Sequence, residues 1–517
     1  MAPVHASDLP PFHNEPFTDF SRPAQAEAFR AALARVRSQL GRSYPNAAGT
    51  RRFQLPATQS STNPARPSEV IGVFPASGAA QADEALAAAE AAFPAWSARP
   101  WEERAAVLLR LASLLRRQKH DWSAWLVLEV GKTWAEADGD TAEAIDFCEW
   151  YAREALRYAR GVDVVQTGDH NECFYVPLGP GVAIAPWNFP LMLETWKIAP
   201  ALAWGNTVVL KPAEDTPTSA TIMARLALEA GFPPGVLNVV HGFGPDSAGQ
   251  ALTENPDVDR ITFTGESGTG RIIGRAAMAN LTPVSLELGG KGANIIFDDA
   301  ELDNAVNWAI QAIFRNAGQV CLAGSRLFVQ RGIYDKFMDR YVAAAEKLKI
   351  GDPSKPDTEF GSLASEEHYT KVCRYIDLVE SEGGKIATGG RGEGWVVKPT
   401  IVTGLTDTSK LVCEEIFGPV VAVLPFDTES EVIARANDNR YGLNAMVFTE
   451  NLNRAHRVAG KLSAGTVWVN CFFIRDLRAP FGGVGDSGIG REGGNFSREF
   501  FTEPKAVVMQ INRESPD

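Results

Sequence analysis

The stretch "GVAIAPWNFPLMLETWKIAPALAWGNTVVLKP" (residues 181–212) contains two short runs rich in β-branched residues, separated by a segment long enough for a helix. Similar runs recur at "GVLNVVHG" (235–242) and "DRITFTG" (259–265), and a helical pattern follows each of them. Strands that alternate with helices at this spacing predict right-handed βαβ units and a parallel sheet. Such a sheet binds its ligands at the carboxyl ends of its strands.

The segments on either side extend the α/β pattern. A second α/β section runs from about 290 to 490, with strand-like runs "RLFVQ", "VVAVLPF" and "TVWVN". Upstream, residues 80–158 have a strongly helical pattern, and residues 24–40 predict an amphipathic helix, followed by a polar Ser/Pro-rich stretch at 55–69. The sequence therefore predicts an α/β protein of several domains.

Two further segments predict contacts between copies of the chain. The alternating pattern of residues 162–179 predicts a hairpin, and "KAVVMQIN" (505–512) predicts a final strand near the C-terminus. Exposed strands rarely stay unpaired, so we expect these segments to pair with a neighbouring subunit. The prediction is a homodimer or homotetramer.

Composition excludes several classes of function. A net charge of −13 argues against nucleic-acid binding, which requires a basic face. No signal peptide or membrane-spanning run is apparent, which favours a cytoplasmic protein without a membrane partner. The scattered cysteines and histidines predict neither a disulfide framework nor a metal site. Five of the six cysteines are expected to be structural thiols: Cys148, Cys173, Cys373, Cys413 and Cys471.

Two glycine-rich patterns are candidate phosphate-binding loops. "GIGREG" (488–493) matches G-x-G-x-x-G, but no predicted strand precedes it, so we reject a dinucleotide interpretation. "GESGTGRIIG" (265–274) is the better candidate, because it follows a strand and leads into a helix whose N–H groups favour a pyrophosphate.

The sixth cysteine stands apart. In "RNAGQVCLAGSR" (315–326), Cys321 is surrounded by small and uncharged polar residues. These residue types alone allow a buried thiol, a metal ligand or a nucleophile. The remaining motifs are needed to decide among these three roles.

Six motifs in order resemble the aldehyde dehydrogenase superfamily, over nearly the whole chain from about residue 50. Cys321 follows Glu287 by 34 residues and Asn188 by 133, and these intervals match as well. The motifs are "APWNFP", "KPAED", "LELGGKGANIIF", "GQVCLAGSR", "EEIFGPV" and "PFGGVGDSGIGREGG".

The resemblance implies a thiol-based oxidation with NAD as the cofactor. A thiolate adds to an aldehyde to give a thiohemiacetal, which a hydride acceptor converts to a thioester. Cys321 would be the nucleophile, while the Asn188 amide and the Cys321 backbone N–H would stabilise the oxyanion. Glu287 would activate the water that hydrolyses the thioester.

The resemblance also assigns cofactor-binding residues. Lys211 and Glu214 would hold the adenosine ribose, and the Glu214 carboxylate would repel a 2′-phosphate, which favours NAD over NADP. Glu415 would hold the nicotinamide ribose. The remaining cofactor contacts are expected from Trp187, Phe417, Gly265, Glu266 and Gly270.

The predicted domains follow from these assignments. Residues 1–50 form an N-terminal helical extension, and residues 51–158 with 179–289 form a parallel-sheet NAD-binding domain. Residues 290–488 form an α/β catalytic domain. The hairpin and the last strand, residues 159–178 and 500–517, form a small β oligomerisation element.

Two parts of the chain resemble different branches of the superfamily. The N-terminal third, with "PFHNEPF" and "RSQLGRSYP", resembles glutamate-semialdehyde (pyrroline-5-carboxylate) dehydrogenases. From about residue 190, and especially in "NCFFIRDLRAPFGG", the chain resembles hydroxymuconic and aminomuconic semialdehyde dehydrogenases. The second resemblance favours a muconic-type semialdehyde as the substrate.

The loop before "PFGG" suits a small anionic aldehyde. Arg475 and Arg478 can bind a carboxylate, and Phe473 suits a flat conjugated chain. Alternatively, Asp476 pairs with one of these arginines and braces the loop. Glutamate semialdehyde and other aldehydes remain alternative substrates.

Two other classes of function agree less well with the sequence. A catalytically inactive structural protein would lack Cys321 or Glu287, and both are present. A CoA-acylating enzyme would release its thioester to CoA, whereas Glu287 favours hydrolysis.

Overall fold

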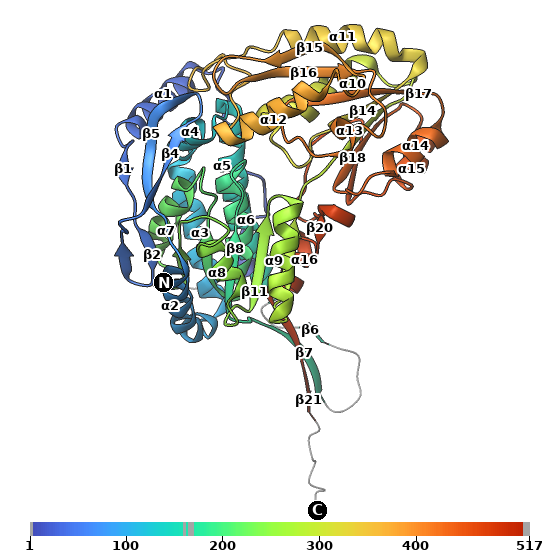
Figure 1. The fold of residues 1–517 in the computed structure, drawn as a ribbon. Helices are drawn as coiled ribbons and strands as arrows, with labels where there is room; N and C mark the ends of the chain where they lie inside the picture. Colours follow the sequence, from blue (N-terminus) through green and yellow to red (C-terminus); the bar gives the residue numbers. More distant parts are fainter. Residues whose placement is uncertain (1–3, 159–161, 164–169, 510–517) are drawn as a thin grey trace, which may run out of the picture.

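Two large sheets organise the computed structural model, which describes residues 4–158, 162–163 and 170–509 (Figure 1). An eight-stranded sheet has the order β20-β12-β11-β8-β9-β10-β2-β3, and a seven-stranded sheet has the order β15-β16-β17-β14-β13-β18-β19. Each sheet forms the centre of one lobe, so the α/β prediction is confirmed.

The eight-stranded sheet contains the predicted βαβ units. Five neighbouring strands run parallel: β8 (Pro180–Ile184), β9 (Thr207–Lys211), β10 (Leu237–Val239), β11 (Arg260–Thr264) and β12 (Val284–Glu287). Their connections are α6 (Pro190–Trp204), α7 (Thr218–Ala230), α8 (Ala248–Glu254) and α9 (Ser267–Ala279). The strands are almost wholly buried, as expected for a parallel sheet covered on both faces.

The edges of this sheet come from distant parts of the chain. At one edge β20 (Gly488–Ile489) runs antiparallel to β12, and at the other β2 (Asn46–Ala48) and β3 (Arg51–Phe53) follow β10. Residues 1–50 therefore contain strand β2 as well as the predicted helix, which is α1 (Pro23–Arg37).

The polar stretch 55–69 contains strands that sequence reasoning did not predict. A separate three-stranded sheet consists of β1 (Arg42–Ser43), β4 (Thr58–Asn63) and β5 (Arg66–Pro75). Strand β4 reads TQSSTN and has no apolar residue, so it lacks the alternation of apolar and polar residues that predicts a strand.

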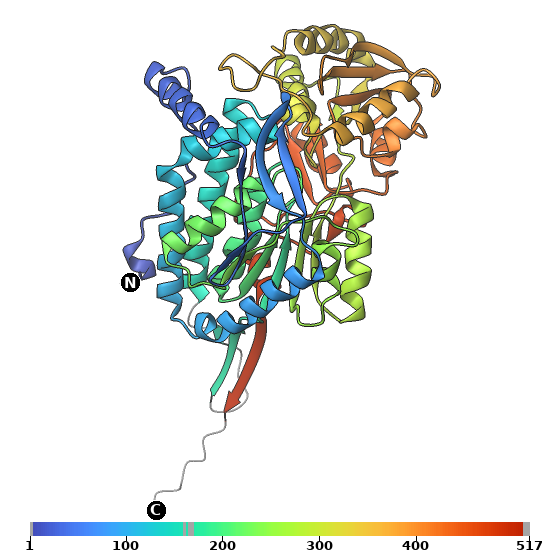
Figure 2. The ribbon, with the colours of Figure 1, turned by 60° about the vertical axis from the view of Figure 1, so that its left-hand side comes forward.

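A helical layer fulfils the prediction for residues 80–158. It consists of α2 (Ala79–Ser97), α3 (Trp101–Arg117), α4 (Lys119–Val130) and α5 (Trp134–Tyr158). Helix α5 packs against both α3 and α6, and the three lie side by side (Figures 1 and 2).

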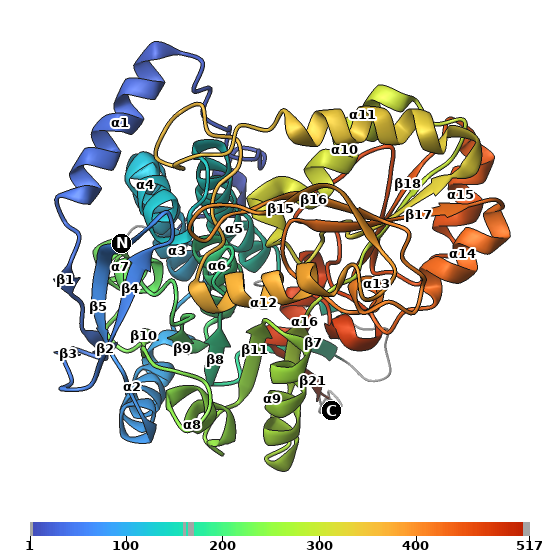
Figure 3. The ribbon, with the colours of Figure 1, turned by 45° about the horizontal axis from the view of Figure 1, so that its top comes forward.

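The second lobe contains the strands predicted from residues 290–490. Six strands run parallel: β13 (Ala293–Ile296), β14 (Arg326–Gln330), β16 (Val397–Thr403), β17 (Val420–Phe426), β18 (Asn444–Phe448) and β19 (Thr466–Val469). The antiparallel β15 (Lys385–Arg391) closes one edge. Figure 3 shows α11 (Tyr334–Glu346) and α12 (Glu366–Leu378) on opposite sides of β15 and β16.

The remaining elements are short. The other helices are α10 (Leu302–Phe314), α13 (Lys410–Cys413), α14 (Glu429–Asn437), α15 (Leu452–Ala459) and α16 (Gly494–Phe501). The 3₁₀ turns are η1 (Ala6–Asp8), η2 (Arg315–Gly318), η3 (Arg331–Ile333) and η4 (Gly485–Ser487). No helix among the described residues is long and apolar enough to cross a membrane.

A three-stranded arm extends from the body of the molecule (Figures 1 and 2). It contains β6 (Val162–Asp163), β7 (His170–Val176) and β21 (Glu503–Met509), all antiparallel. These strands match the predicted hairpin and final strand. Residues 164–169 of that hairpin and 510–512 of that strand lie outside the described residues.

The segment before α1 is fixed along α5 by two buried carboxylates. Asp138 accepts hydrogen bonds from the Thr18 N–H at 2.7 Å and from its hydroxyl at 2.6 Å. Asp146 accepts from the Glu15 N–H at 2.6 Å and from the Asn14 amide at 2.9 Å. The N-terminal segment is thereby held against α5.

Candidate active site

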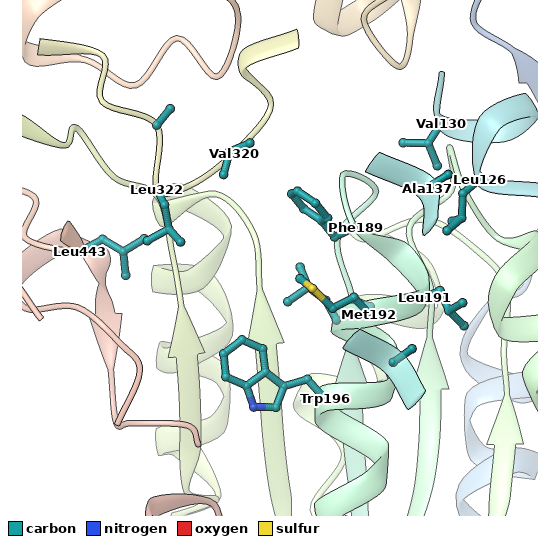
Figure 4. Close-up of a cluster of buried hydrophobic side chains, with 14 of the residues drawn as sticks. Leu126, Val130, Ala137, Phe189, Leu191, Met192, Trp196, Val320, Leu322 and Leu443 are labelled. Carbon is teal, nitrogen blue, oxygen red and sulfur yellow. The ribbon is translucent and has the colours of Figure 1, made fainter. Parts of the chain in front are cut away.

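The carboxyl ends of the parallel strands bring most of the predicted residues together. Lys211 is the last residue of β9 and Glu287 the last of β12, while Trp187 and Asn188 follow β8. Cys321 comes from the other lobe, between η2 and β14. Figure 4 shows Phe189, Met192 and Trp196 facing Val320, Leu322 and Leu443 across the junction of the lobes. The site therefore lies where parallel α/β sheets bind ligands.

An unusual backbone path positions the cysteine. Asn316, Ala317 and Gly318 have φ values of 51°, 52° and 73°, a conformation that only glycine adopts without strain. A Cβ on Gly318 would lie 2.3 Å from the carbonyl carbon of Gly418, so no larger residue fits there. The loop before Cys321 is thus fixed by close contact between two backbone segments.

Asn188 is held beside this loop by a small hydrogen-bond network. Its amide group donates to the Gln319 carbonyl at 2.9 Å. The Asn316 amide donates to the Gln319 and Asn188 carbonyls, both at 3.2 Å. Because a side-chain amide has two N–H groups, the second one of Asn188 stays available for a ligand.

The Cys321 thiol is partly exposed and has an unfavourable ionisation. Burial, followed by the carboxyl groups of Glu415 and Glu287, raises the pKa of the thiol to about 12, while the Arg475 guanidinium opposes this shift. The other cysteines are free thiols as well, two of them buried. A neutral thiol at Cys321 requires a change in its surroundings, or a proton acceptor, before it can act as a nucleophile.

Glu287 is a buried carboxyl whose two oxygens have no hydrogen-bond partner. Burial and the neighbouring Glu492 raise its pKa well above the ordinary value, while Lys197 acts in the opposite direction. Lys197 forms a buried ion pair with Glu492 at 3.1 Å. A Cβ on Gly482 would lie 2.8 Å from Glu287 Oε1, so a glycine leaves space beside this carboxyl group.

The three residues predicted to hold ribose hydroxyls lie in two places, Lys211 and Glu214 at the end of β9 and Glu415 after α13. Lys211 is buried, donates to the Pro212 carbonyl at 3.0 Å, and lies 3.6 Å from the partly exposed Glu214 carboxylate. Glu415 accepts a hydrogen bond from the Gly290 N–H at 2.8 Å, and burial raises its pKa to about 7. Both carboxyl groups can accept hydrogen bonds from hydroxyls.

Trp187 and Phe417 form an aromatic wall with a third ring. Their ring centroids lie 5.3 Å apart in an edge-on arrangement, and the His368 ring lies 4.8 Å from Trp187. The Nε2 atom of His368 lies 2.7 Å from the Phe417 carbonyl oxygen, and burial lowers the His368 pKa to about 4. A neutral imidazole thus fixes the backbone of Phe417, whose φ is 60°.

The predicted phosphate-binding residues lie at the start of α9. Glu266 precedes the helix and is exposed, and Gly265 donates its N–H to the Glu287 carbonyl at 3.1 Å. A Cβ on Gly270 would lie 2.5 Å from a Leu288 methyl group, so glycine allows the first turn of α9 to approach β12. The helix N-terminus is therefore held at the end of the sheet.

The two predicted substrate arginines have different surroundings. The Arg475 side chain is 14% exposed, pairs with Glu143 of α5 at 2.5 Å, and lies 5.6 Å from the Phe473 ring centroid. The Arg478 side chain is 71% exposed and pairs with Asp476 at 2.5 Å. The loop-bracing alternative thus describes Arg478, whereas Arg475 is near enough to Cys321 to oppose the rise in the pKa of its thiol.

Residues 54–507 match the model of the aldehyde dehydrogenase family. The chain belongs to this family. Aldehyde dehydrogenases are oxidoreductases that act on aldehydes, and the thiol, amide and carboxyl groups brought together here suit that chemistry.

Relatives of the family fall into the two branches that the sequence suggests. The chain is 45% identical to 2-hydroxymuconic semialdehyde dehydrogenase of Pseudomonas sp. (strain CF600), over 87% of this chain and 95% of the relative. It is 44% identical to 2-aminomuconic semialdehyde dehydrogenase of Danio rerio, over 86% and 93%. A solved structure of 1-pyrroline-5-carboxylate dehydrogenase from Thermus with bound NAD is 38% identical, has a TM-score of 0.94, and covers 97% of this chain and 100% of its own.

Sequence reasoning missed several residues of this dehydrogenase site. Lys197 lies within the opening stretch, and Glu492 lies within the "GIGREG" pattern that was rejected as a phosphate loop. His368 and Glu143 occur in ordinary helical patterns. Charged residues in an otherwise apolar helix, as Glu194 and Lys197 are in α6, are the one sequence signal of a buried polar network.

Proposed function

We propose that the protein oxidises a small anionic semialdehyde of the muconic type to its carboxylic acid, with NAD as the cofactor. The observation that carries the substrate class is Arg475, a largely buried guanidinium among aromatic rings that is near enough to Cys321 to oppose the rise in the pKa of its thiol. The names of the relatives support the same class. Glutamate semialdehyde is the second candidate, supported by the similarity to the Thermus enzyme.

The fit of NAD rests on the aromatic wall and the two carboxyl groups. Trp187 and Phe417 would line the nicotinamide side, with Glu415 binding its ribose. Lys211 and Glu214 would bind the adenosine ribose, and the first turn of α9 would face the pyrophosphate. When bound, NAD accepts the hydride, and this is the chemistry that the chain's own residues cannot supply.

The first step in the proposed mechanism is attack by Cys321 on the aldehyde carbon. The thiol loses its proton to a nearby carboxylate and forms a thiohemiacetal. The second amide N–H of Asn188 and the Cys321 backbone N–H donate to the developing oxyanion. The Gln319 carbonyl orients the Asn188 amide, so the donor is in place before the charge develops.

Glu287 acts in the second half of the proposed mechanism. After oxidation the acyl group remains on Cys321 as a thioester, and a water molecule must attack it. Glu287 takes a proton from that water, because a carboxyl group with a raised pKa is a stronger base once ionised. The carboxylic acid then leaves and the thiol is restored.

The deciding experiment measures NADH formation at 340 nm with paired substrates. One arm contains fresh 2-hydroxymuconic semialdehyde, the other contains pyrroline-5-carboxylate, and Cys321→Ala is the blank. A higher kcat/KM in the muconic arm supports the proposal. Preference for pyrroline-5-carboxylate would favour the second candidate. Turnover of simple aldehydes alone would exclude both, and acyl-CoA as product would exclude hydrolysis.

A further inference from the structure

A second arginine contacts the Phe473 ring besides Arg475. Arg315 begins η2, directly after α10 and six residues before the cysteine. Its guanidinium carbon lies 5.0 Å from the Phe473 ring centroid, against 5.6 Å for that of Arg475. One ring therefore contacts two guanidinium groups that come from segments of the second lobe far apart in the chain.

Arg315 has no carboxylate partner among the described residues. Its side chain is half-buried, and a half-buried cation without a counter-ion is unfavourable unless a ligand supplies one. Arg478, in contrast, is satisfied by Asp476 at the surface. Arg315 is thus a better candidate than Arg478 for a residue that binds an anionic ligand.

The acids of α5 that border this region all have other partners. Glu136 accepts hydrogen bonds from the backbone N–H groups of Thr133 and Asn316, at 2.9 and 2.6 Å. Asp140 pairs with Lys132 at 3.4 Å, and Glu143 pairs with Arg475. None of the three is within ion-pair distance of Arg315.

A glycine of α5 makes room for this guanidinium. A Cβ on Gly139 would lie 3.7 Å from Nη2 of Arg315 and 3.9 Å from the Phe17 ring. A methyl group would just fit, but a longer side chain would displace the arginine. The contact does not require glycine at this position, but it places the guanidinium directly beside the α5 backbone.

From this geometry we infer that Arg315 is a specificity-determining residue that binds the substrate's carboxylate together with Arg475. The inference rests on the proposed function and names the second cation of its substrate site. The carboxylate lies between the two guanidinium groups, and the flat chain lies along Phe473 with the aldehyde directed toward Cys321. Arg478 has no part in this clamp.

The test compares charge removal at Arg315 with the same change at Arg478. Arg315→Gln should raise KM for 2-hydroxymuconic semialdehyde about 10- to 100-fold, the value of a charge-assisted hydrogen bond to a carboxylate. Its kcat, and its KM for uncharged hexanal, should stay within about threefold of the wild type. Arg315→Lys should restore part of the affinity, and Arg478→Gln should change neither KM.

A second variant displaces the guanidinium without removing it. Gly139→Leu should give the same selective rise in KM, and the thermal midpoint of each variant reports whether the fold persists. If Arg315→Gln folds poorly, Arg315→Lys and Gly139→Leu still test the contact. An unchanged KM for the anionic aldehyde in all folded Arg315 and Gly139 variants overturns the clamp.

The failure of the clamp and the failure of the proposed function give different results. Wild-type enzyme that prefers the anionic aldehyde, with variants that keep this preference, contradicts the clamp alone. Wild-type enzyme that does not distinguish the anionic aldehyde from hexanal contradicts the proposed substrate class and the clamp together.

Discussion

At the residue scale, the chemistry depends on a thiol and a carboxyl group whose pKa values are raised by their surroundings. Cys321 has a pKa raised to about 12 by burial and by two carboxyl groups, and burial raises the Glu287 pKa well above its ordinary value. The Cys321 thiol is therefore mainly protonated near neutrality in the ligand-free protein. Such shifts are typical of active sites, where a binding event supplies the missing stabilisation of charge.

Thiol reactivity in the ligand-free enzyme should follow this ionisation. Because only the thiolate reacts, alkylation of Cys321 by iodoacetamide should rise about tenfold per pH unit, with no plateau between pH 7 and 10. Glu415 is ionised above its pKa of about 7 and raises the thiol pKa, so Glu415→Gln should react faster in this range. Peptide mass mapping gives the rate at Cys321, and Glu214→Gln is the control. A plateau near pH 8 would contradict the raised pKa.

Removal of the Glu287 carboxyl group should separate the two halves of the reaction. Glu287→Gln should lower kcat about 100-fold or more, the usual contribution of a general base. The first turnover of NADH should persist as a burst, because thioester formation precedes the step that needs this base. Rapid-mixing absorbance at 340 nm measures both.

The control for this variant is Glu194→Gln. Glu194 is likewise buried, and burial also raises its pKa well above the ordinary value, but it lies on α6 near Glu129 and Asp140. Its isosteric replacement should leave kcat unchanged. If Glu287→Gln loses the NADH burst as well as kcat, this carboxyl group acts in the first half of the reaction, in which the thioester forms.

Residue types allowed some of these groups to be predicted but not others. Cys321, Glu287 and Asn188 each occur in a motif whose neighbours mark it, such as glycines beside an acid. Arg315, Glu143 and Glu492 carry no such mark, because their roles come from partners more than one hundred residues away in the chain. A single sequence does not contain that pairing information.

At the element scale, strand ends and one distorted loop place the reactive groups. The strands of both large sheets follow from their β-branched runs, because parallel strands are buried on both faces. The peripheral strands β2, β4 and β20 do not, since none of them contains a run of large apolar residues. The backbone path through Asn316 and Ala317 is equally hidden, because neither residue type requires a positive φ.

The distorted loop should tolerate no side chain at Gly318. In Gly318→Ala the new methyl group would meet the Gly418 carbonyl at 2.3 Å, and the φ of 73° adds strain. Movement of the loop by about 1 Å should lower kcat/KM on the order of 100-fold. Steady-state kinetics and a thermal melt check this result.

The matched control for the loop is Gly383→Ala. Gly383 has a similar φ of 81°, but a Cβ there would meet nothing within 4 Å. This variant should lose stability through strain and keep its kcat/KM. Equal activity losses in both variants would show that backbone strain alone, and not the contact with Gly418, impairs the enzyme.

At the scale of the whole molecule, the arm of β6, β7 and β21 leaves apolar surface in solvent. Strand β21 is exposed along nearly its whole length, and it pairs with β7 on one side only. The Val508 side chain is 64% exposed in the single chain. An edge strand with exposed apolar residues is an unstable arrangement for a monomer, so we expect another subunit to cover it.

The assembly state tests this expectation. Val508→Asp places a charge on the exposed strand, which should reduce the homodimer or homotetramer to smaller species in sedimentation velocity at micromolar concentration. Leu452→Asp is the matched control, because Leu452 is 70% exposed at the start of α15, far from the arm (Figure 1). That variant should sediment like the wild type, and its fold should be unchanged, since an acid is favourable in the first turn of a helix. A wild-type monomer, or an unchanged assembly in Val508→Asp, would mean that the arm does not join subunits through this strand.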